Sequence, residues 1–169
     1  MLEIRATTEK DAHYLLDIDI KCFEYAWLPD DWRKAGKNCL ACVATWNGTP
    51  IAVVIFSNNQ CGGIDIAKIA VKAAYRNQGI ARRLLYNCAL YARETGAVEL
   101  LMLVPESRLR PGEPDDISRW LTRLGFRAEV PLFKDWFEFY GEREDGVLFY
   151  LPIPQQSIDT GIRIVQDQT

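Results

Sequence analysis

Hydrophobic residues recur along the chain at two spacings, which together predict strands and helices. Apolar runs and alternations typical of strands cover residues 2–5, 39–46, 51–57, 64–71, 98–104, 126–133 and 147–153. Apolar residues three or four positions apart predict helices over residues 8–20, 79–95 and 115–124. We therefore expect one mixed α/β domain over residues 1–153, with about seven strands and about four helices. Residues 154–169 form a polar tail, in which residues 162–165 can add an edge strand.

Turn and cap residues mark the ends of several of these elements. Asn47-Gly48 between two apolar runs is a strong hairpin signal, because both residues tolerate positive φ. Thr8, followed by three charged residues, is typical of a helix N-cap. Gly96 and Gly125 are typical of helix C-termini, so the two later helices are expected to end there.

Composition places the chain among ordinary globular proteins. It has 169 residues, of which 49% are hydrophobic and 25% charged, and this excludes a disordered or low-complexity chain. The net charge of −3 argues against a nucleic-acid partner, because phosphate backbones need a basic surface. No apolar run approaches the roughly 20 residues of a membrane helix, and the sequence begins without a charged and apolar leader. We therefore expect a cytoplasmic protein with no membrane or nucleic-acid partner.

Five scattered cysteines fit a reducing compartment better than a disulfide framework. Cys39 and Cys42 have the spacing of a redox or metal pair. Because they fall in a predicted strand, however, their odd separation sends the side chains to opposite faces. The only histidine, His13, lies in a predicted helix with no nucleophile in a triad arrangement. We therefore expect no metal site.

The segment that joins the strand at 64–71 to the helix at 79–95 carries the clearest chemical signal. From Lys68 to Arg83 there are five basic residues and no acidic one, although the chain is acidic overall. Small residues at positions 79 and 81 allow backbone N–H groups at the helix N-terminus to approach an anion. A phosphate-bearing ligand fits this local charge. From these residues alone, the alternative is an ordinary strand-to-helix turn with a solvated basic helix start.

One stretch resembles the acetyl-CoA-binding motif of the GNAT superfamily of N-acyltransferases: Val71-Lys-Ala-Ala-Tyr-Arg-Asn-Gln-Gly-Ile-Ala-Arg-Arg-Leu-Leu85. That motif reads Val-x-x-x-Tyr/Phe-Arg/Gln-x-x-Gly-x-Gly/Ala-x-x-Leu-Leu. The order of elements over residues 2–151 and the Leu-Gly-Phe at 124–126 are also similar to the family. The resemblance implies a mostly antiparallel sheet that splays open between the strands at 64–71 and 98–104.

The resemblance also implies acetyl-CoA as the co-substrate, without a metal. Pantetheine would pair with backbone groups of the strand, and the diphosphate would lie on N–H groups of the loop and the helix N-terminus. Arg76 would shape the loop, and the next two arginines would add charge near the diphosphate or the 3′-phosphate. The residues implied are Ile69, Ala70, Val71, Arg76, Asn77, Gln78, Gly79, Ile80, Ala81, Arg82 and Arg83.

Acyl transfer to an amine needs a neutral nucleophile, so a nearby base is useful. Asp65 is the candidate base, because it lies eleven residues before Arg76, where histone-acetylating members of the family carry a catalytic Glu. The alternative for Asp65 is a strand-edge acid hydrogen-bonded to a neighbouring loop. Glu24, Asp30 and Glu138 are alternative bases on flanking segments.

The general acid is where the sequence departs from the family. Many members carry a Tyr four residues before the Gly of Gly-Phe, and Leu121 has that position here. Tyr140 and Tyr86 are the candidate substitutes, so the predicted catalytic residues are Asp65 and Tyr140. The departure leaves acetyl-CoA binding intact and bears on catalytic efficiency.

Two aromatic and acidic segments, at 23–32 and 133–145, are expected to frame the acceptor side. Such surroundings suit a lysine side chain, a peptide N-terminus, a polyamine or an aminoglycoside; alternatively, these aromatic residues are core or dimer contacts. We therefore expect an N-acetyltransferase that transfers acetyl from acetyl-CoA to a primary amine by direct attack. The alternative is a catalytically weak GNAT-fold module that binds acyl-CoA or a protein partner. A homodimer is compatible with either.

Overall fold

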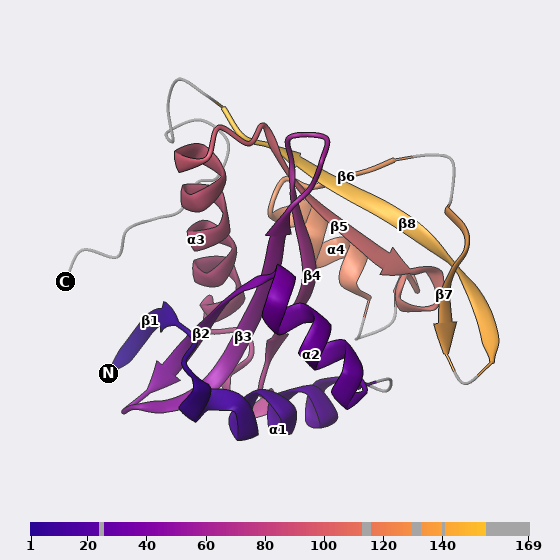
Figure 1. The fold of residues 1–169 in the computed structure, drawn as a ribbon. Helices are drawn as coiled ribbons and strands as arrows, with labels where there is room; N and C mark the ends of the chain where they lie inside the picture. Colours follow the sequence, from indigo (N-terminus) through magenta and orange to yellow (C-terminus); the bar gives the residue numbers. More distant parts are fainter. Residues whose placement is uncertain (24–25, 113–115, 130–132, 140, 155–169) are drawn as a thin grey trace.

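The computed structural model describes residues 1–23, 26–112, 116–129, 133–139 and 141–154. Within these residues the chain forms eight strands and four α-helices (Figure 1), which confirms the expected mixed α/β class. The strands are β1 (Leu2–Ala6), β2 (Leu40–Trp46), β3 (Thr49–Asn58), β4 (Ile64–Val71), β5 (Glu99–Pro105), β6 (Arg127–Ala128), β7 (Phe133–Phe139) and β8 (Glu142–Pro152). The α-helices are α1 (Ala12–Cys22), α2 (Pro29–Asn38), α3 (Ile80–Glu94) and α4 (Ile117–Arg123).

The sheet is antiparallel except at its centre. Its strand order is β1-β2-β3-β4-β5-β8-β6, and β7 pairs with β8. The parallel neighbours β4 and β5 share only the pairs Ile64–Leu100 and Asp65–Leu101. Beyond these pairs the two strands diverge, so the expected splayed sheet is confirmed and a wedge opens between β4 and β5.

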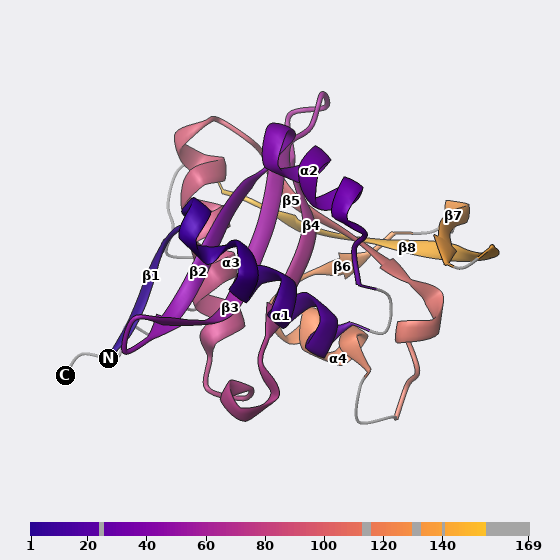
Figure 2. The same cartoon turned by 60° about the horizontal axis from the view of Figure 1, so that its bottom comes forward.

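Helices cover the two faces of the sheet (Figures 1 and 2). Helix α1 packs Leu15 and Ile18 on one face, where Trp32 of α2 joins the same cluster. Helices α3 and α4 pack on the other face, with Leu84 and Leu121 fully buried in the larger cluster. None of the helices among the described residues has the length and apolar character required to cross a membrane.

A β-bulge in β4 changes which face its side chains occupy. Ile55 pairs with Lys68 and Phe56 pairs with Ile66, which leaves Ala67 as one extra residue in β4. Ile66 therefore belongs to the cluster under α3, whereas Lys68 faces α1. The bulge lies directly after the last pair that β4 forms with β5, so it marks where the wedge begins.

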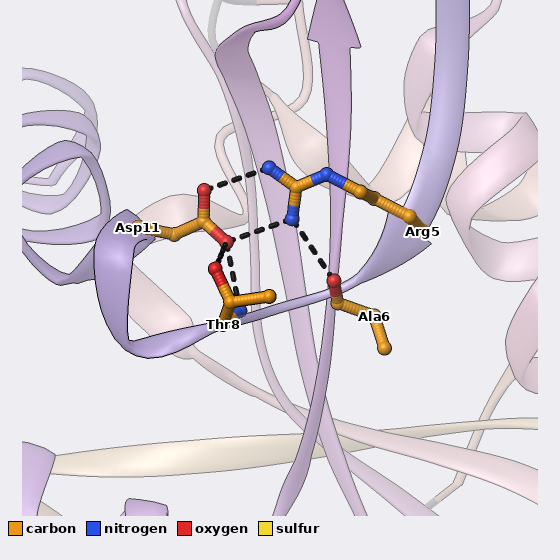
Figure 3. A network of polar contacts seen from close by, with 4 residues as sticks. All are labelled: Arg5, Ala6, Thr8 and Asp11. Carbon is orange, nitrogen blue, oxygen red and sulfur yellow. Dashed lines mark hydrogen bonds and ion pairs between the residues drawn. The ribbon is translucent and has the colours of Figure 1, made fainter.

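Arg5 and Asp11 connect β1 to the start of α1 (Figure 3). The two guanidinium nitrogens of Arg5 donate to the two carboxylate oxygens of Asp11 at 2.7 and 2.8 Å. The N–H and hydroxyl of Thr8 donate to the same carboxylate at 2.7 and 2.9 Å. These hydrogen bonds, with that from Arg5 as the largest cause, hold the pKa of Asp11 well below its usual range.

Two elements differ from the sequence prediction. Helix α2 has too few apolar residues, Trp32 and Ala35, to signal it in the sequence, and it begins with Pro29 and two acids, which suit a helix N-terminus. Strand β7 occupies a segment for which the sequence predicts no strand beyond residue 133, because its exposed side chains lack the alternation of a half-buried strand. Among the described residues of the predicted strand at 126–133, Arg127 and Ala128 form β6, and Phe133 is the first residue of β7. The possible edge strand at 162–165 lies outside the described residues.

Candidate functional site

The connection from β4 to α3 ends in a glycine that adopts a left-handed conformation. Gly79 is the N-cap of α3 with φ of +74°, and Asn77 has φ of +62°. The N–H of Arg83 donates to the carbonyl of Gly79 at 3.1 Å and so begins the hydrogen bonding of the helix. The N–H groups of Ile80 and Ala81 precede this bond and point out of the helix end. This end of a 15-residue helix therefore combines free N–H donors with the positive end of the helix dipole, which suits an anion.

Arg76 folds back on the end of β4. Its Nε donates to the carbonyl oxygen of Val71 at 3.0 Å. The thiol of Cys22 approaches the same oxygen at 3.5 Å from the end of α1. The guanidinium thus closes the loop between β4 and α3 and fixes how the loop leaves the strand.

The backbone of β4 presents alternate residues to the wedge. The N–H of Lys72 donates to the carbonyl of Ile51 at 2.9 Å. Counting back from Lys72, every second residue of β4 therefore forms its backbone hydrogen bonds with β3. In an antiparallel pair, the residues between them direct N–H and C=O away from the partner. Ile69 and Val71 therefore direct their backbone groups to the side from which β5 has diverged.

Three adjoining hollows follow this open edge. The first, here called the basic groove, has a volume of about 460 Å³ and runs from the end of α1 across β4 to the N-terminus of α3. It is lined by all of the expected cofactor residues except Gln78 and Arg83, namely Ile69, Ala70, Val71, Arg76, Asn77, Gly79, Ile80, Ala81 and Arg82. Trp120 and Leu124 of α4 and Arg108 complete its far wall.

The second hollow, the cleft cavity, lies in the wedge itself. It has a volume of about 220 Å³ between β4 and β5. Residues common to it and the basic groove are Phe23, Ile69, Arg108 and Ile117. The two hollows therefore adjoin at these residues.

The third hollow, the outer groove, lies beyond the cleft cavity. It has a volume of about 580 Å³ and shares Trp27 and Ala67 with the cleft cavity. Asp31 of α2 and Glu138 of β7 give it two carboxylates, and Lys34 gives it one ammonium. A ligand in the basic groove and a second one in the outer groove would thus meet at the bulge in β4.

The structure places the predicted base Asp65 away from the three hollows. Asp65 is exposed at the closed part of β4 and accepts a hydrogen bond from the side chain of Asn59 at 3.0 Å, which is the loop contact described as its alternative. It is not among the residues that line the three hollows. Glu138 does line the outer groove, whereas Tyr140 and Glu24 lie outside the described residues.

A buried ion pair, which the sequence pattern does not identify, lies beside the cleft cavity. The ammonium of Lys68 pairs with the carboxylate of Asp19, and their side chains are 5% and 1% exposed. Burial lowers the pKa of Lys68, while the hydrogen bond to Asp19 opposes that change. The signal in the sequence is a lysine within the apolar strand 64–71, but its partner on α1 is 49 residues away.

Three aromatic rings of the first aromatic segment surround this ammonium. The Nζ of Lys68 lies 4.5, 4.4 and 5.9 Å from the ring centroids of Phe23, Trp27 and Trp32. These rings thus already hold a cation of the chain itself. The sequence pattern predicts that these rings face a cationic acceptor. For these three residues the contact with Lys68 supports the alternative, core contacts.

The segment from Lys68 to Arg83 carries less net positive charge than its five basic residues indicate. Asp19 neutralises Lys68, and the carboxylate of Asp17 lies 3.1 Å from the ammonium of Lys72. Both acids come from α1, which packs on β4 from a distant part of the sequence. The positive charge that remains belongs to arginines around the N-terminus of α3.

Cys39 and Cys42 join different core clusters on the two faces of the sheet, as their odd separation predicts. Both are free thiols. Among the described residues, no group of three or more His, Cys, Asp or Glu side chains has the arrangement of a metal site.

Comparison with known protein families assigns the chain. The model of the acetyltransferase (GNAT) family matches residues 11–110, which is more than half of the chain and includes β4, the loop and α3. This chain belongs to the GNAT acetyltransferase family. The resemblance stated from residues 71–85 is therefore confirmed. A search of curated proteins finds no match.

Solved structures share this GNAT fold at low sequence identity. The ribosomal-protein-S18-alanine N-acetyltransferase of Escherichia coli is 22% identical with a TM-score of 0.73, over 94% of this chain and 98% of that one. NAA60 of Arabidopsis thaliana, in complex with a bisubstrate analogue, is 17% identical with a TM-score of 0.73, over 92% and 99%. A GNAT family acetyltransferase of Elizabethkingia anophelis with acetyl-CoA bound is 17% identical with a TM-score of 0.69, over 89% and 97%.

This GNAT chain lacks a hydroxyl where many members place their tyrosine. Leu121 is fully buried in the core cluster under α3 and α4. Its neighbour Trp120 lines the basic groove instead. A proton donor for the leaving group is therefore not provided from this position of α4.

Proposed function

We propose that this protein is an acetyl-CoA-dependent N-acetyltransferase acting on a primary amine. The observation that supports it best is the series of three adjoining hollows from the N-terminus of α3, through the wedge between β4 and β5, to the outer groove. Two substrates can enter from opposite ends and meet at the bulge. A module that only binds acyl-CoA has no need of the outer groove.

The residues of the basic groove fit acetyl-CoA. The N–H groups at the start of α3 suit the diphosphate, because they combine hydrogen-bond donors with the positive end of the helix dipole. A Cβ at Gly79 would have nothing within 4 Å, so the backbone is open to a phosphate at this point. The outward backbone groups of Ile69 and Val71 suit the amides of pantetheine.

The reaction proposed is direct attack of the amine on the thioester. The amine nitrogen forms a bond to the carbonyl carbon, the carbon–sulfur bond breaks, and CoA leaves as the thiol after taking up a proton. The nitrogen loses one proton, which Asp65 or a carboxylate of the outer groove can accept directly or through water. Backbone N–H groups of β4 at the wedge are the expected donors to the carbonyl oxygen as it gains charge.

The acceptor side favours an amine that approaches between α2 and β7. Asp31 and Glu138 can attract a cationic group from opposite sides of the outer groove. A lysine side chain, a peptide N-terminus, a polyamine and an aminoglycoside all have such a group. The peptide belongs in the set for a second reason, since the E. coli neighbour is named for acetylating an alanine of a ribosomal protein.

One observation favours the alternative of a catalytically weak acyl-CoA-binding module. The buried Leu121 removes the proton donor that many GNAT members use. The CoA thiol is acidic enough to leave without full assistance, so this loss slows turnover rather than forbidding it. Turnover therefore decides between the two functions.

The first test is calorimetric titration with acetyl-CoA, with CoA and 3′-dephospho-CoA as controls. Saturable binding of acetyl-CoA, weakened when the 3′-phosphate is removed, is the expected result. Release of free thiol from acetyl-CoA is then measured with the four classes of amine. Binding with thiol release above the uncatalysed rate for one class supports the transferase.

The other outcomes are equally informative. Binding without thiol release for any amine supports the acyl-CoA-binding module. Absence of binding to all three CoA compounds overturns the proposal. A pull-down for protein partners of the fold would then follow.

A further inference from the structure

The ion pair of Lys68 and Asp19 is placed at the junction of the three hollows. Lys68 follows the bulge residue of β4 and lines the cleft cavity. Phe23 lines both the cleft cavity and the basic groove, and Trp27 lines both the cleft cavity and the outer groove. The rings packed on the ammonium are thus the same rings that divide the hollows.

Asp19 holds this arrangement by three hydrogen bonds. One carboxylate oxygen accepts from Lys68, and the other accepts from the backbone N–H of Trp27 at 2.8 Å and from Nε1 of Trp32 at 3.2 Å. The carboxylate therefore joins α1, the segment before α2, α2 itself and the bulge of β4. Loss of the Asp19 carboxylate would weaken the bond to the backbone of Trp27, and loss of the Lys68 ammonium would remove the charge that packs on the Phe23 and Trp27 rings.

A buried ion pair often contributes no more to stability than apolar side chains that fill the same space in a core. Removing two charges from water costs several kcal/mol per ion, and apolar residues of similar volume often give equal or greater stability. The aromatic and aliphatic neighbours could pack without it, as Val53 and Ile55 do in the same cluster. What the pair adds is a fixed geometry, because hydrogen bonds to Asp19 fix the backbone at Trp27 and the indole of Trp32, whereas apolar contacts have no preferred direction.

We propose that Lys68 and Asp19 are positioning residues of the acyl site: the pair fixes Phe23 and Trp27 as the wall against which the acyl group of the thioester packs. The inference rests on the proposed function, since the acyl group is that of acetyl-CoA. Neither residue acts on the substrate itself. Their effect reaches it through the two rings.

The pair has a second consequence for the acceptor. The rings that would suit an external ammonium are filled by that of Lys68, so the charge of an acceptor is recognised in the outer groove by Asp31 and Glu138. Trp27 also lines that groove, where it offers an apolar surface to the acceptor's carbon atoms. The wall thus serves both substrates.

The test compares the affinities of CoA and acetyl-CoA, which needs no knowledge of the acceptor. Burial of the acetyl group against the wall should make acetyl-CoA bind about fourfold tighter than CoA, the factor that corresponds to ~0.8 kcal/mol for one buried CH₂. Tryptophan emission should change on addition of acetyl-CoA and less on addition of CoA, because Trp27 lies at the acyl end of the cleft.

Three variants separate positioning from stability. Lys68→Met and Asp19→Asn each leave one partner buried alone, and both should lose the preference for acetyl-CoA while CoA affinity changes less than about twofold. The double variant Lys68→Met/Asp19→Asn removes both charges and should fold at least as readily as the single variants. It should still lack the preference and the emission change. Asp11→Asn is the matched control, because it breaks a buried carboxylate pair remote from the hollows.

Each result has a definite meaning. A folded double variant that keeps the fourfold preference overturns the inference and leaves the proposed function standing. A wild-type protein that binds CoA and acetyl-CoA equally also overturns it, because the wall then makes no contact with the acyl group. Failure of the wild-type protein to bind any CoA compound overturns the proposed function instead.

Discussion

Gly79 affects both the stability of the fold and the proposed binding of CoA, and the two effects can be measured separately. Its φ of +74° disfavours any side chain, and it lies where a phosphate would contact the backbone. We predict that Gly79→Leu lowers the free energy of unfolding by about 1–2 kcal/mol through the left-handed backbone and abolishes CoA binding by obstructing the N-terminus of α3. Urea unfolding and calorimetric titration measure the two effects.

The matched control for this prediction lies at the other end of the same helix. Gly96 has φ of +73° and, like Gly79, would have nothing within 4 Å of an added Cβ. Gly96→Leu should therefore cost a similar free energy of unfolding and leave CoA affinity unchanged. Equal CoA affinity in Gly79→Leu and the wild-type protein would remove this loop from the binding site.

Asp65 and Glu138 are the two candidate bases, and replacing each carboxylate by the corresponding amide distinguishes them. If Asp65 is the base, Asp65→Asn should lower kcat about a hundredfold at pH 7 with the best amine of the panel. The loss should narrow toward pH 9, because more of the amine is then neutral without help. Acetyl-CoA affinity should not change, since Asp65 lies outside the basic groove.

Glu138→Gln is the comparison variant, because Glu138 lines the outer groove. A full rate in Asp65→Asn from pH 7 to 9, with a loss in Glu138→Gln, would assign the base to β7. The pH profile thus tests the sequence prediction against the position that the structure favours by proximity.

At the scale of single residues, sites formed by one continuous segment could be predicted from the sequence. Contacts between residues far apart in the sequence could not. The loop at 76–81 could be predicted because all of its chemistry lies within one strand–loop–helix segment. Lys68 could not be given its role, because Asp19 and the three rings reach it only after α1 has packed on the sheet. The same packing neutralises Lys72 through Asp17, which the charge count along the chain cannot show.

At the scale of elements, the connection between β1 and α1 depends on one ion pair. The pKa of Asp11 is lowered in the folded protein, so the stability it contributes is present above the unfolded pKa near 4 and is lost as pH falls through the lower folded value. We predict that Asp11→Asn lowers the free energy of unfolding by about 1–3 kcal/mol at pH 7. The gap between variant and wild type should shrink below pH 4.

Urea unfolding followed by circular dichroism at pH 7 and pH 3 measures this gap. A gap of the same size at both values would show that the charge of Asp11 contributes nothing and that only its shape matters. Acetyl-CoA affinity should be unchanged in the variant. Arg5, Thr8 and Asp11 lie together where β1 leads into α1 (Figure 3), and none of them lines the basic groove.

Strongly patterned elements could be predicted from the sequence, and weakly patterned ones could not. Strand β4 has its predicted bounds, and α3 begins and ends within a residue of its own. Helix α2 and strand β7 were missed because neither has a side buried enough to impose a hydrophobic period. The wedge came only from the family resemblance, since divergence of β4 from β5 depends on the bulge at Ala67 and leaves no local signal.

At the scale of the whole molecule, the proposed function requires a chain of net charge −3 to attract the polyanion CoA at one place. Once Lys68 and Lys72 are paired with α1, that attraction depends on arginines near the N-terminus of α3. Arg82 lines the basic groove and Arg83 does not. The positive potential is therefore confined to a smaller region than the five basic residues between Lys68 and Arg83 indicate. The attraction that it exerts should weaken as the salt concentration rises.

This placement gives a prediction with a control on the same helix. Arg82→Gln should weaken CoA binding by about tenfold or more, because a charge-assisted hydrogen bond contributes about 1.5–3 kcal/mol. Arg93→Gln changes the net charge equally but lies in the last turn of α3, so CoA affinity should stay within about twofold. Titrations at low and high salt should show a shallower salt dependence for Arg82→Gln only. Equal losses in the two variants would mean that net charge, rather than the groove, attracts the ligand.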